Sequence, residues 1–154
     1  QMRKAEREIK DFGSIVELLG RCDTIRLGLN NGEYPYVVPV SFGFEVSEGR
    51  IVIYIHGARD GLKRQLIAAN GKVCVEADLF NGYTGTGHGI TADYASVIGF
   101  GSISPVEGDE AVHGISLILE HCGREGYDPA SCIALNITAV DRIVLDRVTG
   151  KKRF

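Results

Sequence analysis

The feature that most constrains this chain is a series of short β-type segments joined directly by turn residues. The first two segments, residues 24–29 and 34–46, flank an Asn-Gly dipeptide at 31–32, which is a strong hairpin signal between runs of this kind. A second turn at 47–49 leads at once into residues 50–56. Parallel strands need long crossover connections, whereas antiparallel strands are joined by short turns. The chain is therefore predicted to form an antiparallel sheet.

Later segments extend this pattern and add helices. Further β-type runs and stretches of helical apolar spacing follow, the runs at 72–80, 94–106 and 132–146 and the helical stretches at 3–20, 61–69 and 109–121. In the second of these helices we expect Leu62, Leu66 and Ala69 to share the buried face. The sequence NGYTGTGHG (81–89) is interpreted as a glycine-rich loop.

The predicted strands define a fold class. Pro35 and Pro39 cannot donate to a strand ladder, so the segment 34–46 is expected at a sheet edge or broken by bulges. Six or seven strands of this length close a small antiparallel barrel that side chains fill. We therefore predict a mainly β (α+β) protein, a six- to seven-stranded antiparallel β-barrel with a few peripheral helices. A large ligand must then bind on the outside of the barrel or at a subunit interface.

Length and composition bound the class of protein. The chain has 154 residues, 44% apolar and 24% charged, and is expected to form one domain, residues 1–154. Its net charge of −3 argues against broad binding to nucleic acid, which needs a basic face. No apolar run approaches the roughly 20 residues of a membrane helix. Residues 1–12 are charged throughout and lack the apolar core of a signal peptide, so we expect a cytoplasmic protein.

Other patterns that could carry chemistry lack the necessary context. Residues 87–92 match GxGxxA, but a dinucleotide site needs a helix after this pattern, and a strand is predicted there. No Ser, His and Asp stand in a hydrolase motif. The four cysteines form no CxxC pair, and we expect them to remain unpaired thiols. No metal site is predicted, because no zinc spacing is present among His113, His121, Cys122 and Cys132.

The stretch IVIYIHGARDGLKRQLI (51–67) is the strongest candidate for a site. An apolar strand ends on His56, a glycine-bearing turn follows, and Lys63 stands near the start of the next helix. A cation at this end of a helix gains nothing from the helix dipole. Lys63 and His56 are therefore either ordinary surface residues or parts of a phosphate site in which backbone N–H groups of 57–61 also take part. The residues alone leave both interpretations open.

The order of these segments resembles a known family. CDTIRLGL, YPYVVPVSFGF, IVIYIHGARDGLKRQL, KVCVEAD and YASVIGFGSI together resemble the FMN-binding split-barrel proteins of the pyridoxamine 5′-phosphate oxidase-like superfamily. Within it, the chain is most similar to the nitroimidazole-resistance (nitroreductase-like) subgroup. The resemblance spans about residues 3–152 and implies a single FMN-binding split-barrel domain. It also implies a homodimer with a flavin in each of two clefts at the interface.

The resemblance assigns roles to particular residues. The strand 38–42 is expected to run along the flavin, mostly through backbone groups, and Lys63 to hold the phosphate. Ser96 stands where the oxidases carry a glutamine that contacts the flavin. The complete set of residues placed at the cofactor is Val38, Pro39, Val40, Ser41, Phe42, His56, Gly57, Ala58, Lys63, Arg64 and Ser96.

Two departures from the family pattern bear on activity. The oxidases carry arginines where this chain has Val38 and Leu62. Their loss removes bidentate phosphate recognition and argues against oxidation of pyridoxamine phosphate. It also leaves FAD as an alternative to FMN. Arg59 or Arg64 could compensate from nearby positions.

Two hypotheses about function follow from the resemblance. The first is an FMN-dependent oxidoreductase that reduces small aromatic or nitro compounds, with His56 as the catalytic residue that donates a proton or a hydrogen bond. The alternative is a non-catalytic flavin- or haem-binding module, in which a histidine could serve as an axial ligand. Flavin bands in the absorbance spectrum favour the first class, and a Soret band favours the second.

Overall fold

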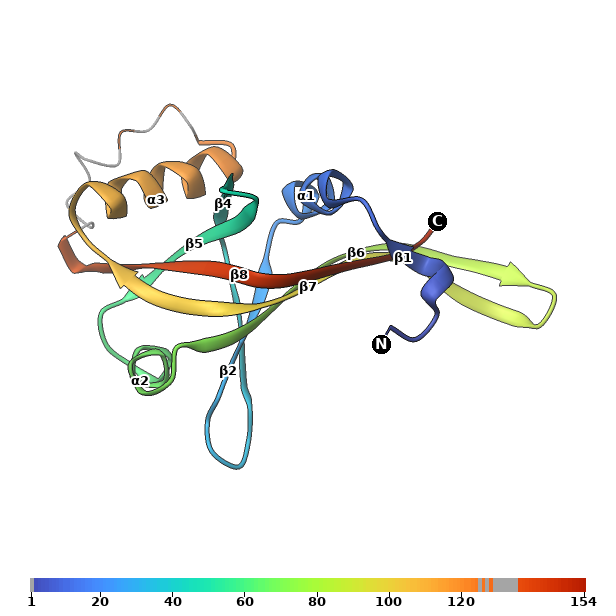
Figure 1. The fold of residues 1–154 in the computed structure, drawn as a ribbon, viewed down its shortest axis with the longest axis horizontal. Helices are drawn as coiled ribbons and strands as arrows, with labels where there is room; N and C mark the ends of the chain where they lie inside the picture. The colour runs from blue at the N-terminus through green and yellow to red at the C-terminus, as the bar shows by residue number, and fades with distance from the viewer. Residues whose placement is uncertain (1, 125, 127, 129–135) are drawn as a thin grey trace.

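A computed structural model describes residues 2–124, 126, 128 and 136–154 and shows a curved antiparallel sheet with helices on its outside (Figure 1). The elements in chain order are η1 (a 3-10 helix, Ala5–Arg7), β1 (Glu8–Ile9), α1 (Phe12–Arg21), β2 (Ile25–Leu29), β3 (Tyr36–Val40), β4 (Gly43–Ser47), β5 (Arg50–Ala58), α2 (Leu62–Ala69), β6 (Lys72–Thr86), β7 (Gly89–Val106), α3 (Gly108–His121) and β8 (Thr138–Arg153).

The sheet confirms the predicted antiparallel β-barrel with peripheral helices. Seven strands follow one another in the order β3-β2-β6-β7-β8-β5-β4, and every ladder is antiparallel. The two-residue strand β1 pairs with the end of β8, beyond the part that β5 occupies. The described residues thus form eight strands, because the segment 34–46 divides in two and β1 was not predicted.

The division of the segment 34–46 bears out the expectation drawn from its prolines. Among the described residues β3 is an edge strand that pairs with β2 alone, and Pro39 lies opposite Arg26. The ladder ends after Val40, and the fully buried Phe42 begins the corner that leads into β4. Burial of a Phe side chain stabilises a fold by about 1.5–3 kcal/mol, so Phe42 fixes where the strand bends.

Two of the helix predictions need correction. The N-terminal helix begins at Phe12 rather than residue 3, because Asp11 caps it by accepting a hydrogen bond of 2.9 Å from the Ser14 N–H. The segment before it forms η1 and β1 instead. In α2 the buried residue is Ile67. Of the three residues expected on the buried face, Leu66 is half-buried and packs against the barrel core, whereas Leu62 and Ala69 are exposed.

The predicted loop at 81–89 is also corrected. β6 continues to Thr86 and β7 begins at Gly89, so these residues form most of a long two-stranded ribbon. The alternation of glycine with threonine suits paired strands because threonine favours a pleated surface. The absence of a helix after Gly89 agrees with the rejection of a dinucleotide fingerprint at 87–92. Among the described residues, no helix is long and apolar enough to cross a membrane.

Apart from Arg50 at its start, His56 is the first residue of β5 that is exposed to solvent, and the core explains why. The five preceding residues of β5, 51–55, are all buried. One face of β5 packs into the barrel core with Ile53 and Ile55, and the other packs Tyr54 under α3 beside Ile118. The strand leaves both layers at His56, which is exposed. The fold therefore presents this end of β5 at the surface.

Candidate functional site

The end of β5 and the start of α2 form the centre of the candidate site. His56, Gly57 and Ala58 continue the β5 ladder opposite residues 140, 139 and 138 of β8. Gly61, with a φ of 105° that favours glycine, then opens α2 one residue before Leu62. The chain needs only this short turn to bring the first turn of α2 back against the strand end.

Lys63 lies against the backbone of Gly57. A Cβ atom built on Gly57 would be 2.6 Å from the Lys63 Nζ, so only a glycine leaves room for the ammonium in this position. Within the described part of the chain, Lys63 makes no hydrogen bond or ion pair. Burial lowers its pKa below the ordinary value, with Arg64 adding to the shift and Asp141 opposing it. The site therefore holds a partly buried cation without a direct counterion.

His56 is next to this cation. Although His56 is exposed as a whole, neighbouring residues partly desolvate its ring. This partial desolvation lowers the pKa of His56, and the Lys63 charge lowers it further. Both causes favour the neutral imidazole, which has one donor and one acceptor nitrogen. A neutral ring at this position can donate a hydrogen bond to a ligand without adding charge.

Arg64 points in a different direction from Lys63. Its two terminal nitrogens donate hydrogen bonds of 2.7 and 2.6 Å to the carboxylate of Asp141 on β8, whose side chain is 0% exposed. The Nε of Arg64 is buried and has no partner within the described residues. Asp141 was not predicted. The signal for it is weak, a single carboxylate inside the apolar run of 137–145.

The predicted strand 38–42 approaches the same end of β5 through its corner. Gly43 pairs with Tyr54 in an antiparallel ladder. The two residues before Gly43, Ser41 and Phe42, therefore lie beside the end of the strand that carries His56. The Phe42 ring is buried and packs 4.4 Å from the His121 ring, measured between centroids. Only its backbone can therefore face a ligand. Val38, Pro39 and Val40 lie on β3, with only Pro39 clearly exposed.

Ser96 lies far from this cluster within one chain. It pairs with Lys151, whereas Gly57 pairs with Ala139, twelve residues earlier on β8. At about 3.3 Å per residue, this separation is roughly 40 Å measured along the strand. Ser96 and Lys63 therefore lie toward opposite ends of β8.

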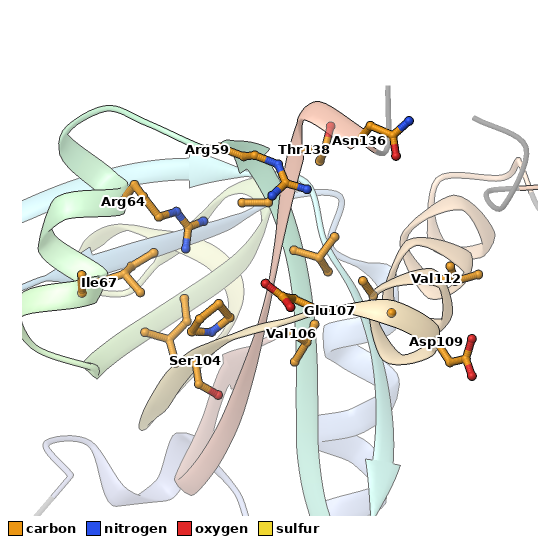
Figure 2. A pocket seen from close by; sticks show the side chains of 17 residues that line it. Arg59, Arg64, Ile67, Ser104, Val106, Glu107, Asp109, Val112, Asn136 and Thr138 are labelled. Carbon is orange, nitrogen blue, oxygen red and sulfur yellow. The ribbon is translucent and has the colours of Figure 1, made fainter. Parts of the chain in front are cut away.

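A cavity of about 890 Å³ lies beside the cluster, on the Arg64 side of α2 (Figure 2). Arg59 and Arg64 contribute basic side chains to its lining, and Glu107 and Asp109 at the start of α3 contribute acidic ones. Apolar side chains, among them Ile67, Val106 and Val112, also line it. Neither His56 nor Lys63 reaches it. The cavity and the predicted phosphate site are therefore distinct, although both use α2 and the start of β8.

His113 and His121 have partners within the protein. The His113 Nε2 lies 3.0 Å from a Glu45 oxygen, and the His121 Nε2 lies 2.7 Å from the Cys22 carbonyl oxygen. In the described residues, no group of three or more His, Cys, Asp or Glu side chains could hold a metal ion. Cys22, Cys74 and Cys122 are free thiols, and Cys132 lies outside the described residues.

Comparisons with known proteins agree with this fold. Residues 12–152 match the sequence pattern of the pyridoxamine 5′-phosphate oxidase family. The chain therefore belongs to that family. A comparison with curated proteins found no match.

Solved structures show the same architecture. A Bacteroides thetaiotaomicron protein, for which 5-nitroimidazole antibiotic resistance has been suggested, is 26% identical (TM-score 0.78; coverage 94% of this chain and 85% of that chain). The flavocytochrome Anf3 from Azotobacter vinelandii is 17% identical, with a TM-score of 0.79 and coverage of 100% and 72%. An FAD-binding protein from Mesorhizobium loti is 18% identical, with a TM-score of 0.68 and coverage of 96% and 98%. At these identities the last two show the fold alone.

Proposed function

We propose that this protein is a flavin-dependent oxidoreductase that binds FMN at the end of β5 and reduces small aromatic or nitro compounds. The observation that carries the proposal is the Lys63 ammonium, which is partly buried, lies against Gly57 and lacks a counterion among the described residues. A phosphate is the ligand that such a cation favours, because a charge-assisted hydrogen bond offsets the cost of burying the charge. Membership of the pyridoxamine 5′-phosphate oxidase family supports the same assignment.

The residues of the site fit a phosphorylated flavin. The missing side chain of Gly57 leaves a recess in which the ammonium lies, and exposed Ala58 leaves the strand end open to solvent. Backbone N–H groups at the start of α2 add donors for a phosphate. Lys63 would hold the phosphate, and Ser41 and His56 would face the ring from the two strand ends. Arg64 is engaged by Asp141, so we assign it to the support of α2, with only its Nε left over.

The chemistry of the chain's own residues follows from these positions. A bound flavin supplies the electron transfer, and the protein supplies placement and electrostatics. The lowered pKa of His56 keeps its imidazole neutral near pH 7, so one ring nitrogen can donate a hydrogen bond to a substrate. Lys63 would hold the phosphate end of the flavin, and its positive field favours the binding of a negatively charged ligand.

A homodimer is part of the proposal. Ser96 can serve the same flavin as Lys63 only from a second subunit, given their separation along β8. A flavin on the outside of a filled barrel also needs a second surface to exclude water. The Mesorhizobium loti relative is described as FAD-binding, so FAD is the alternative to FMN. Anf3 is described as a flavocytochrome, and an absorbance spectrum tests haem as the second ligand class.

The experiment that tests the phosphate site compares two flavins. Lys63→Ala should weaken FMN binding by about 1.5–3 kcal/mol, the scale of a hydrogen bond to a charged group. This corresponds to about tenfold or more in affinity. Binding of riboflavin, which has no phosphate, should change little. Fluorescence quenching titrations measure both.

Two further variants sharpen this experiment. Gly57→Ala should fold, because the new Cβ meets only the flexible end of the Lys63 side chain. It should displace the ammonium, and it should therefore weaken the binding of FMN but not that of riboflavin. Lys72→Ala removes an exposed lysine that donates to Ser102 on the sheet, and it should change neither affinity. Equal FMN affinity in the parent and in Lys63→Ala contradicts the proposed site.

A further inference from the structure

The hairpin between β6 and β7 extends beyond the rest of the molecule. The last residue of β7 that pairs with β8 is Tyr94, opposite Arg153. Residues 80–92, here called the arm, therefore pair only with other residues of this hairpin in the described structure, and Phe80 pairs with Tyr94 at the base of the arm. Figure 1 shows the arm in yellow-green, projecting away from the barrel and the helices.

The arm has one apolar and one polar face. Tyr83 pairs with Ala92, and Ile90 pairs with Gly85, two residues after Tyr83. Cross-strand partners and residues two apart share a face of a sheet, so Tyr83 and Ile90 lie on the same face. They are 73% and 77% exposed. Phe80, 63% exposed, contacts Tyr83 with ring centroids 5.2 Å apart.

The opposite face carries threonines. Thr84 pairs with Thr91, and Thr86 lies two residues after Thr84 on the same face. This alternation is typical of a ribbon with one face in water and the other covered by protein. The apolar face is covered by nothing within the described part of the chain.

The arm also lacks the charges that protect exposed strands. No Asp, Glu, Lys or Arg occurs from residue 79 to residue 92, in a chain that is 24% charged. Natural proteins place lysines or prolines on free strand edges to prevent association, and protein interfaces are depleted of charge and enriched in aromatic residues. The composition of the arm is that of an interface.

Asp93 anchors the base of the arm to the end of β8. Asp93 is buried, accepts a hydrogen bond from Thr84 and forms an ion pair with Arg153 at the end of β8. Two-stranded ribbons are only marginally stable alone. The fixed base presents the apolar face in a defined orientation, which lowers the entropic cost of binding.

We propose that the apolar face of the arm packs against a second copy of this chain and forms part of the dimer contact. This inference rests on the dimer in the proposed function and names its surface. In a twofold dimer both subunits contribute their arm to the interface, so each apolar side chain of the arm is buried in two copies. Three large side chains on two arms, with the surface they cover, bury on the order of 1,500 Å². Stable specific interfaces bury about 1,600 Å².

Sedimentation velocity of the full chain at about 10 µM tests the proposal. The parent should sediment as a dimer. Tyr83→Lys with Ile90→Lys should sediment as a monomer, with the dissociation constant raised about 100-fold or more, because two charges would be buried at the contact. The control is Thr91→Lys, which adds one lysine to the opposite face, next to Ile90 in the sequence, and should leave the dimer intact.

A second variant guards against misfolding of the first. Tyr83→Ala with Ile90→Ala adds no charge and should raise the dissociation constant about tenfold or more, as truncation of central interface residues does. Far-ultraviolet circular dichroism checks that each variant is folded. A parent that stays monomeric at 50 µM, or a lysine variant that dimerises as the parent does, overturns the inference.

Flavin binding measured on the same samples separates the two proposals. A parent that dimerises through the arm but binds neither FMN nor FAD overturns the proposed function and supports the arm contact. A parent that binds FMN but dimerises independently of the arm supports the proposed function and overturns the arm contact.

Discussion

Lys63 and Arg64 are neighbours in the first turn of α2, yet their surroundings differ completely. Arg64 donates two hydrogen bonds to the buried carboxylate of Asp141. Lys63 lies against Gly57 and has no acidic partner within hydrogen-bond distance among the described residues. The hydrogen bonds to Asp141 raise the pKa of Arg64, whereas burial lowers the pKa of Lys63. The first cation belongs to the scaffold, and the second is available to an anion.

The difference teaches how the site is supported. The Arg64 pair joins α2 to β8, and Ile67, three residues later on the same side of the helix, packs into the barrel core. These two contacts set the rotation of α2 about its axis. Lys63, about 100° away around the helix, is thereby directed toward Gly57. The buried pair positions a lysine that it does not touch.

The largest expected effect is on stability. Arg64→Met should lower the free energy of unfolding by about 3–5 kcal/mol, because it leaves the Asp141 carboxylate buried without a counterion. Lys63→Met should not destabilise the ligand-free protein and should raise its stability by at most about 1 kcal/mol, since a partly exposed charge is screened by solvent. Urea denaturation of both variants measures the contrast.

A double variant distinguishes loss of the pair from loss of packing. Arg64→Met with Asp141→Leu removes both charges together, and it should be more stable than Arg64→Met alone. If Lys63→Met and Arg64→Met destabilise the protein equally, the distinction between a scaffold cation and a ligand cation is wrong.

The next effect is on stabilisation by ligand. FMN at about 100 times its dissociation constant should stabilise the parent by about 2.7 kcal/mol. At the same FMN concentration, Lys63→Met should lose most of this stabilisation by FMN. Thermal unfolding with and without FMN measures the change, and riboflavin at a matched multiple of its own dissociation constant is the control. An undiminished gain with FMN in Lys63→Met would show that another group holds the phosphate.

The sequence predicted local features of this site well and non-local ones poorly. The strand that carries His56 and the helix that begins near Lys63 are encoded by adjacent residues, and both were found close to where they were expected, although the strand continues two residues beyond His56. The partner of Arg64 is 77 residues away, and no local pattern links the two. The expected buried face of α2 was right only for Leu66 and wrong for Leu62 and Ala69, because this pairing, together with Ile67, sets the orientation of the helix.

The glycine-rich segment 81–89 shows a second limit. Glycine clusters usually indicate a loop, and here they obscured a ribbon whose threonines and Ile90 favour strands. Pairing of residues 83–86 with residues 89–92 outweighed the preference of the glycines for a loop. The apolar face of the arm followed only from the observed register, which places Tyr83 and Ile90 on one side.

The smallest expected effect concerns His56 and uses it as a reporter of the neighbouring charge. Burial and the Lys63 charge both lower its pKa from 6.5. Lys63→Met removes the second cause, so the pKa of His56 should rise toward the ordinary value. Arg64→Lys keeps a cation opposite Asp141 and should leave the His56 pKa nearly unchanged. Titration of the His56 ring protons by nuclear magnetic resonance measures both variants.

The direction of the pH effect on stability follows from the same shift. Because the folded state lowers the pKa of His56, it disfavours the protonated ring. The stabilising contribution of the neutral ring is therefore complete above pH 6.5 and is lost as the pH falls toward the folded pKa. His56→Ala should abolish this part of the acid dependence. It should also weaken FMN and riboflavin binding alike, by about 0.5–1.5 kcal/mol, the net value of a neutral hydrogen bond. A loss confined to FMN would place His56 on the phosphate rather than beside the ring, and the roles of His56 and Lys63 would no longer be distinct.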